Sequence, residues 1–273
     1  MATGGNGGAG SRRKVGRGDR ERVMLVMIAE DDGLHRSFAR AIVERLWQGA
    51  VEVIEATNGD EAIDLGIRLA PSHVVLDLQL PRATGIEVAR ALWSRRADIQ
   101  ILFWSNFADE SYVRGVARIV PPGSVYGYVL KSTSEEGMRS ALRGVFSEGH
   151  CIIDREVRGI QSRVQDRLEG LTDGEYEGLI DIALGLTDKA IAARRGLSTR
   201  GAQARLKHLY EKLGVAPDGT GTDKAGSAFN SRTRAIYLAL ARGMINIDAL
   251  RREQEKLDEW LAAGPPAGQR WPQ

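Results

Sequence analysis

The first half of the chain contains four short strand-like segments, each rich in apolar residues and each followed by a polar side chain. They cover 23–29, 72–76, 99–104 and 126–130. Patterns typical of helices separate them, which is the arrangement of a parallel sheet covered on both faces. Parallel strands end at one edge of such a sheet, where α/β proteins place their functional sites. We therefore expect a doubly wound α/β domain over 22–149.

The polar residues after these segments form a chemically consistent set. In chain order they are Glu30 and Asp31, Asp77, Ser105 and Lys131. Clustered carboxylates bind a hard cation such as Mg²⁺, which neutralises charge on a transferring phosphoryl group. A lysine adds a positive charge, and a serine hydroxyl can hydrogen-bond a phosphoryl oxygen. The set predicts phosphoryl transfer to Asp77, which would be the nucleophile and form an aspartyl phosphate.

Each of these residues also has an ordinary structural explanation. Glu30 and Asp31 suit an acidic turn, Ser105 a helix cap, and Lys131 the protein surface. Tyr128, in the fourth segment, suits a core aromatic residue whose hydroxyl reaches the surface. Such explanations are favoured for any one residue alone. They do not explain why the whole set follows strand-like segments in this order.

The same positions resemble the receiver domain of two-component response regulators. The resemblance is carried by Glu30–Asp31, by Val75–Pro81 with Gly85, by Ser105, and by Gly127–Lys131. It implies a five-stranded parallel sheet, a sensor histidine kinase as partner, and phosphorylation at Asp77. It also implies that Glu30, Asp31, Asp77 and the Gln79 backbone carbonyl bind Mg²⁺. In the family, residues at the positions of Ser105 and Tyr128 sense the phosphoryl group and act as the switch aromatic.

Two features depart from that family. The large Trp104 precedes Ser105, and Asn106 stands where a small residue is usual. The segment before the last strand-like stretch contains Pro121 and Pro122 and is longer than usual. These departures support an alternative in which the receiver is a protein-interaction module that works without phosphorylation.

The second half of the chain has the pattern of an all-α domain over 170–245. Thr172 and Glu175 have capping-box spacing, Thr187 and Ser198 suit the starts of two further helices, and Gly214 suits a helix end. In the helix after Ser198 an apolar stripe opposes a cation-rich face. Two short helices joined by a tight turn, the second with such a face, match the requirements for insertion into a DNA major groove.

This half resembles the LuxR-type helix-turn-helix, and with the receiver the chain resembles the NarL/FixJ class of response regulators. The resemblance implies a DNA-binding transcription regulator that is a homodimer at least on DNA. The residues expected to contact double-stranded DNA are Arg200, Gln203, Ala204, Lys207 and His208. A helical dimerisation or protein-binding module with a solvated cationic face is the alternative. An insertion at 216–230 interrupts the family pattern and suits a flexible loop.

The remaining segments are assigned from composition and periodicity. Residues 1–21, rich in glycine and arginine, are expected to form a disordered tail. Residues 150–169 suit a linker helix with one apolar stripe. The extension 246–273 suits a helix to about 263, either pairing with a second copy or packing back on its own chain.

Composition narrows the compartment and the class of protein. The net charge is only +2, so the local excess of cations over 194–212, with Glu211 as its single acid, matters more than the total. The single cysteine, Cys151, excludes an intramolecular disulfide, suits a reducing cytoplasm, and is expected to be a small buried residue. No apolar segment is long enough to span a membrane. We find no candidate general acid or base for an enzyme acting on small substrates, and expect the chain not to be one.

Overall fold

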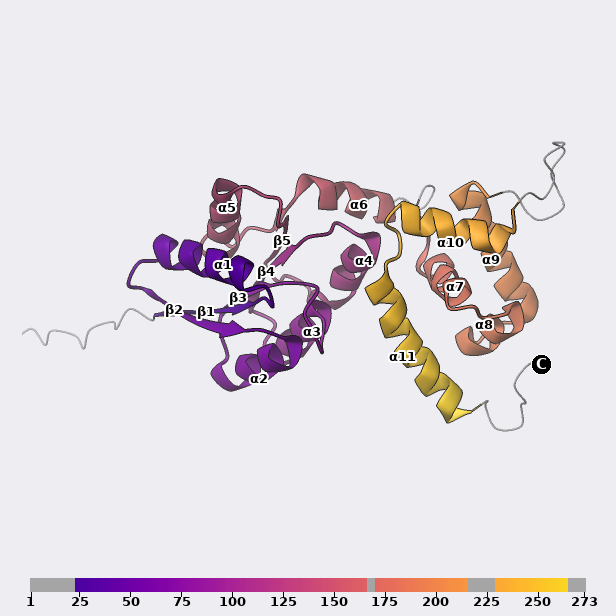
Figure 1. Cartoon of the computed structure of the whole chain (residues 1–273), viewed down its shortest axis with the longest axis horizontal. Coiled ribbons are helices and arrows are strands. Elements are labelled where there is room, and N and C mark those ends of the chain that lie inside the picture. Colours follow the sequence, from indigo (N-terminus) through magenta and orange to yellow (C-terminus); the bar gives the residue numbers. More distant parts are fainter. Residues whose placement is uncertain (1–22, 166–169, 216–228, 265–273) are drawn as a thin grey trace, which may run out of the picture.

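The computed structural model describes residues 23–165, 170–215 and 229–264. The predicted tail, most of the predicted insertion and the last nine residues lie outside the described part. The described chain forms two cores, one around a sheet and one made of helices. Figure 1 shows them side by side along the long axis of the molecule. Within the described ranges, no helix is both long and apolar enough to cross a membrane.

The first core is a parallel sheet of six strands in the order β2-β1-β3-β4-β5-β6. The strands are β1 (Met24–Ala29), β2 (Val51–Ala56), β3 (His73–Leu76), β4 (Gln100–Ser105), β5 (Tyr126–Leu130) and β6 (Ile152–Ile153). The doubly wound parallel sheet is confirmed. β2 lies at one edge and is only partly buried, and it accordingly carries two glutamates, Glu52 and Glu55, among its apolar residues.

Helices cover both faces of this sheet, as Figure 1 shows. On one face lie α1 (Gly33–Leu46) and α5 (Glu135–Phe146), which share a core with Val26 and Ile28 of β1. On the other lie α2 (Gly59–Leu69), α3 (Gly85–Arg95) and α4 (Glu110–Ile119), which share a core with Met27 and Ala29. Successive residues of β1 therefore serve opposite faces, as strand geometry requires.

The sheet has one strand more than the expected five, because the segment assigned to a linker helix begins differently. Ile152 and Ile153 pair with β5, whose outer edge would otherwise leave its backbone N–H and C=O groups unpaired. The helix α6 starts only at Arg155 and extends to Gln165. It packs against the sheet core through Val157 and Ile160, so it is part of the first domain.

Cys151 lies just before β6 and is exposed, which corrects the expectation that it is buried. Its side chain lies at the edge of the sheet, with Sγ 3.9 Å from the Ser124 carbonyl oxygen. The strand β6 has only two residues, so it is too short to bury the side chain of Cys151 just before it. The apolar residues that were expected to accompany Cys151 in one helix are instead divided between β6 and α6.

The second core is entirely helical. Its helices are α7 (Asp173–Ala183), α8 (Asp188–Arg195), α9 (Thr199–Leu213), α10 (Ser231–Ala241) and α11 (Ile247–Ala263). The predicted local signals are confirmed: Thr172 and Glu175 form a capping box, and Thr187 and Ser198 cap α8 and α9. Gly214 ends α9 with a φ of 71°, which glycine adopts without steric cost.

The long helix α11 lies against both cores, in the angle between α4 and α7 in Figure 1. Its Leu257 is buried in the helical core, and Leu250 packs beside it. Of the two outcomes left open for the extension, the structure shows packing on the same chain. Ile247 and Leu261, two further apolar residues of this helix, stay exposed.

Candidate phosphorylation site and nucleic-acid interface

Two neighbouring strands bring the predicted acidic residues together. β1 and β3 pair so that Ala29 lies opposite Leu76, and the Asp77 N–H donates to the Ala29 carbonyl over 2.9 Å. Glu30 and Asp77 therefore leave the sheet at the same edge, only 1% and 4% exposed. Oxygen atoms from Glu30, Asp31 and Asp77 all lie within 4.8 Å of one another. Asp31 differs in being exposed.

Lys131 joins these carboxylates from β5. Its Nζ donates to Asp77 Oδ2 and to Glu30 Oε1, each over 2.9 Å. Burial acts to lower the pKa of the lysine, but the negative charges of Asp77 and Glu30 outweigh it and raise that pKa. The ring centroid of Trp104 lies 5.5 Å from Nζ, which adds a cation–π contact. The large residue before Ser105 thus packs directly against the lysine.

Glu30 is the most perturbed acid of this cluster. Burial raises its pKa, hydrogen bonding to Lys131 lowers it, and the charge of Asp77 raises it again. The result is a pKa of about 7 instead of the ordinary 4.5. Two carboxylates held together away from water repel each other, so one keeps its proton more tightly. Glu30 is therefore partly protonated near neutral pH when no cation is bound.

Ser105 and Tyr128 both contact one residue of the loop between β4 and α4. The buried Ser105 Oγ accepts a hydrogen bond from Phe107 N over 3.3 Å. The Tyr128 hydroxyl donates to the Phe107 carbonyl oxygen over 2.8 Å. The Tyr128 ring is buried, and burial raises the pKa of its hydroxyl. Movement at Ser105 would thus reach Tyr128 through the backbone of Phe107.

Gln79 and Gly85 shape the loop after β3. The Gln79 N–H donates to Asp77 Oδ1 over 3.1 Å, while its side-chain amide donates to Asp248 of α11 over 2.9 Å. A Cβ at Gly85 would lie 2.1 Å from the Asp77 carbonyl oxygen, so only glycine lets α3 begin there. Asp248 was not among the predicted site residues, and no local sequence signal marks it.

The donor set of this cluster fits a hard cation. Three carboxylates supply anionic oxygen, the ligand type that Mg²⁺ prefers, and the exposed Asp31 leaves one side open to water. Lys131 occupies part of the same space and neutralises part of the charge. A cation there would favour the charged form of Glu30 and so oppose the effects of burial and of Asp77 on its pKa. The residues present are therefore compatible with the predicted magnesium site.

The second candidate site is the exposed face of α9. Its apolar stripe of Ala202, Leu206, Leu209 and Leu213 is buried in the helical core. The five predicted DNA-contacting residues all lie on the outer side and are exposed: Arg200, Gln203, Ala204, Lys207 and His208. Within the described part of the chain, Gln203 donates to Asp188 over 3.3 Å, and Lys207 and His208 lie 3.7–3.9 Å from Glu211. This face remains open within the described chain.

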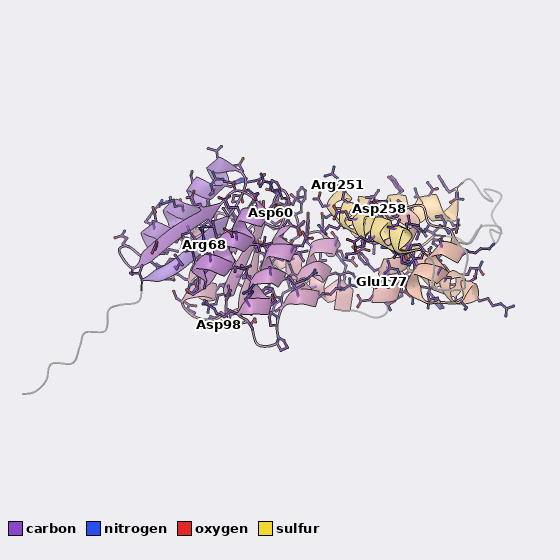
Figure 2. All side chains as sticks on the ribbon, turned by 90° about the horizontal axis from the view of Figure 1, so that it is seen from below. Asp60, Arg68, Asp98, Glu177, Arg251 and Asp258 are labelled. Carbon is purple, nitrogen blue, oxygen red and sulfur yellow. The ribbon has the colours of Figure 1, made fainter. Side chains whose placement is uncertain are left out.

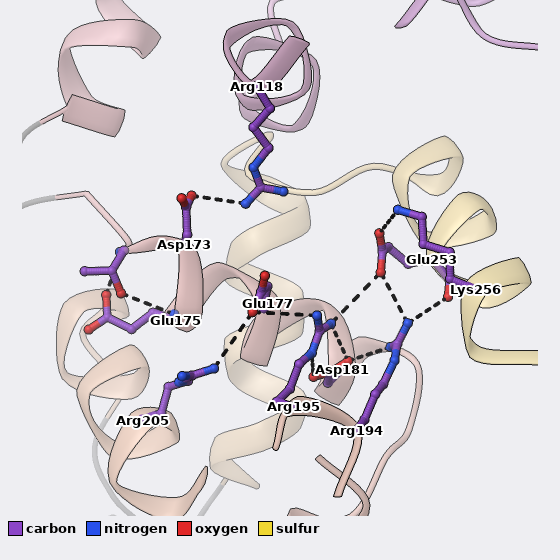
Figure 3. A network of polar contacts seen from close by, with 11 residues as sticks. Arg118, Asp173, Glu175, Glu177, Asp181, Arg194, Arg195, Arg205, Glu253 and Lys256 are labelled. Atoms are coloured by element: carbon purple, nitrogen blue, oxygen red, sulfur yellow. Dashed lines mark hydrogen bonds and ion pairs between the residues drawn. The ribbon is translucent and has the colours of Figure 1, made fainter. Parts of the chain in front are cut away.

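Four other cations over 194–212 do not join that face, and one of them, Lys212, donates to Glu175 over 2.9 Å. Arg194 and Arg195 both bind the carboxylate of the fully buried Asp181, over 2.6–2.9 Å. Arg205 lies 3.9 Å from Glu177. Figure 3 shows this network, in which acids of α7 meet the arginines of α8 and α9. The positive charge of the stretch is therefore partly neutralised inside the domain, and the outward charge is smaller than the sequence suggests.

Comparisons with known proteins connect both sites. Residues 26–143 match the family described as the response regulator receiver domain. The chain is 31% identical over 198 residues to the nitrate/nitrite response regulator protein NarP of Escherichia coli, across 70% of this chain and 88% of that protein. It is 29% identical over 229 residues to the transcriptional regulatory protein YdfI of Bacillus subtilis, across 82% of this chain and 98% of that protein.

Two further comparisons agree. The DNA-binding transcriptional activator DevR/DosR of Mycobacterium tuberculosis is 30% identical over 203 residues, across 70% of this chain and 89% of that protein. A structure of two RcsB dimers bound to two parallel DNAs shares the fold with a TM-score of 0.51 at 21% identity, across 71% of this chain and 94% of that one. Because relatives at 30% identity or more match along most of their length, the chain belongs to the NarL/FixJ-type response regulators, which are DNA-binding transcriptional regulators of two-component systems.

Proposed function

We propose that Asp77 is the phosphoacceptor of this regulator and that a sensor histidine kinase is its phosphodonor. A carboxylate oxygen of Asp77 attacks the phosphorus atom, and the donor's leaving group departs with the electron pair of the bond that breaks. The supporting observation is the position of Lys131, whose Nζ contacts both Asp77 and Glu30 at the carboxyl edge of the sheet. The same ammonium can bind an oxygen of the transferred group.

Glu30, Asp31, Asp77 and the Gln79 backbone carbonyl are the proposed ligands of Mg²⁺. The ion, when bound, offsets negative charge on the phosphoryl group. Glu30 must lose its proton to be a ligand, and its raised pKa makes this step sensitive to pH near neutrality. Lys131 stays in the site as a cation that the chain itself supplies, 2.9 Å from Asp77.

Ser105 and Tyr128 are the proposed sensors of phosphorylation. Ser105 Oγ accepts from Phe107 N, so a movement of Oγ toward a phosphoryl oxygen would disturb a bond to the β4–α4 loop. Tyr128 is bonded to the same residue of that loop. This shared contact supports a change at α4, next to the helical domain, after phosphorylation.

The proposed DNA interface is the exposed face of α9, inserted into the major groove of double-stranded DNA. Gln203 can bond adenine bidentately, and Lys207 can meet guanine or a phosphate. Arg200 and His208 extend the face with further donors, and Ala204 leaves room between them. We propose that a homodimer binds DNA, because two copies of one short reading helix recognise a longer site.

The deciding experiment is the intact mass of the chain after incubation with Mg²⁺ and acetyl phosphate. We expect the native chain to gain one phosphoryl group and Asp77→Asn to gain none. Asp60→Asn, an exposed acid at the start of α2 that Figure 2 labels, is the matched control and keeps the gain. An unmodified native chain, under conditions that modify another receiver, would contradict the proposal.

A receiver that works as a protein-interaction module without phosphorylation is the second candidate. The contact between Trp104 and Lys131 favours it, because this ring packs on the lysine that a phosphoryl group would use. Full occupancy of DNA sites by Asp77→Asn in the cell is its expected signature. Loss of occupancy in that variant, with the Asp60→Asn control unaffected, would exclude it.

A further inference from the structure

The helix α11 bridges the two domains, and its N-terminal end lies near the phosphorylation site. On the helical domain it is held by the buried Leu257 and by Glu253, whose Oε2 lies 3.3 Å from Arg194. This second contact belongs to the network around Asp181 in Figure 3. The first turn of α11 reaches the receiver instead. One rigid helix thus connects the DNA-binding core to the loop after β3.

Asp248 makes the principal contacts of that first turn. Its Oδ2 accepts from the Gln79 side-chain amide and from the Tyr112 hydroxyl, each over 2.9 Å. Tyr112 is fully buried on α4, so its hydroxyl depends on this partner. Arg251 lies 3.9 Å away and Arg252 lies over the Tyr112 ring, so the carboxylate is partly compensated. Two receiver elements therefore bind one carboxylate of the helical domain.

The start of α4 is fastened to the same region by its backbone. The Glu110 N–H, at the first position of α4, donates to the Gly243 carbonyl over 2.9 Å. Asp109 occupies the N-cap position of α4 but makes no side-chain cap bond; its Oδ2 instead accepts from Asn246 over 2.8 Å. Asn246 in turn caps α11 through Ala249 N. The N-terminal ends of α4 and α11 are thus tied to each other through the side chains of Asp109 and Asn246.

Gln79 places this contact next to the phosphoacceptor. Its backbone N–H donates to Asp77 Oδ1, and its side chain donates to Asp248. A phosphoryl group on Asp77 carries about −1.5 to −2 charge, in place of the single negative charge of the carboxylate, on the Asp77 side of this residue. The Asp248 carboxylate lies on the other side. Repulsion between the two anions opposes simultaneous phosphorylation and docking of α11.

We propose that Asp248 is a positioning residue of the phosphorylation site and that α11 is a latch which phosphorylation of Asp77 releases. The proposal rests on Asp77 being the phosphoacceptor. By linkage, phosphorylation weakens docking, and docking disfavours the phosphorylated state by the same factor. The latch leaves the exposed face of α9 uncovered and acts by holding α4 and the orientation of the helical domain.

Amide hydrogen exchange at the start of α4 tests the latch. The first amide of a helix has no intrahelical acceptor, so protection of the Glu110 N–H reports its bond to Gly243. Asp248→Ala removes two hydrogen bonds, and we expect exchange at Glu110 to rise about tenfold. The matched control is Asp258→Asn, an exposed acid farther along α11, labelled in Figure 2, which accepts a hydrogen bond from Gln254 of the same helix. It leaves exchange at Glu110 unchanged.

The variant Asp248→Asn separates the charge from the hydrogen bonds. Its amide oxygen still accepts a hydrogen bond, so Glu110 stays protected before phosphorylation. After incubation with Mg²⁺ and acetyl phosphate, we expect protection to fall about tenfold in the native chain and much less in Asp248→Asn. A purely structural role for Asp248 would make both chains respond equally.

The outcomes distinguish the latch from the function on which it rests. Intact mass is recorded in the same samples. A native chain that carries the phosphoryl group but keeps its protection at Glu110 overturns the latch and leaves the proposed function standing. Unchanged exchange in Asp248→Ala also overturns it. A native chain that gains no phosphoryl group overturns the proposed function and the coupling together, whatever exchange shows.

Discussion

At the scale of single residues, three buried charges carry the proposed chemistry. Burial of Glu30, together with the charge of Asp77, raises the pKa of Glu30 to about 7, and Lys131 offsets this rise only in part. Because like charges repel each other in this site when it is empty, a cation that binds there is strongly stabilised. The same repulsion explains why one acid of the cluster is exposed: Asp31 adds a ligand without adding a third buried charge.

Binding of Mg²⁺ should depend on pH in a defined direction. The folded-state pKa of Glu30 is about 7 and the ordinary value is 4.5, so folding without metal favours the protonated form. Stability of the metal-free chain therefore falls as pH rises from about 4.5 to 7. Because Mg²⁺ needs the deprotonated form, its affinity should fall about tenfold per pH unit below 7. Calorimetric titration between pH 6 and 8 measures this; equal affinities across that range would contradict it.

Lys207, on the exposed face of α9, should release about one counterion when the chain binds DNA. Lys207→Ala is expected to weaken binding similarly across sequences and to reduce the salt slope by about one. Affinity for double-stranded DNA, measured at several salt concentrations, tests this. Arg68→Ala, an exposed cation on α2 labelled in Figure 2, serves as the control and keeps the slope. If both variants behave alike, Lys207 is not in the interface.

At the scale of elements, α6 differs most from expectation. Its sequence pattern suits a linker helix, but Val157 and Ile160 belong to the core beside α4. The physical reason is the free edge of β5, which recruits Ile152 and Ile153 and so directs the following helix onto the same domain. A helix with one apolar stripe packs on whichever apolar surface its preceding residues bring close.

Removing the contact of α6 should destabilise the receiver. Ile160→Ala deletes a side chain that is 6% exposed, and we expect a loss of about 3 kcal/mol in the free energy of unfolding. Arg158→Ala, on the exposed side of the same helix, should change it by less than about 0.5 kcal/mol. Urea denaturation of the full chain measures both. Equal, small effects would show that α6 is a linker after all.

At the scale of the whole molecule, the two domains meet through buried polar groups. Arg114 of α4 is 5% exposed and donates to Glu110, to Asp173 at the start of α7, and to the Leu171 carbonyl. It also lies over the Tyr176 ring, 4.8 Å from the centroid. Contacts of this kind are specific in direction, so they fix one orientation of the domains. They can also be exchanged for contacts with water when the domains separate.

Loss of Arg114 should loosen this interface. Arg114→Ala leaves Glu110 without its partner, and we expect the radius of gyration from small-angle X-ray scattering to increase. Arg118→Ala removes a half-exposed arginine that shares Asp173 and should leave the radius nearly unchanged. An unaltered radius in Arg114→Ala would mean that the interface depends on α11 alone.

The sequence by itself determined the parallel sheet, the edge at which Glu30, Asp77 and Lys131 meet, and the capped helices of the second half. It could do so because each depends on a local pattern, and because parallel strands bring their ends together. Only the tertiary structure decided the sixth strand, the inward ion pairs of Arg194 and Arg195, and the contact of Asp248 with Gln79. These contacts join residues up to 169 positions apart. No local pattern encodes such pairs, since their geometry depends on how whole domains pack.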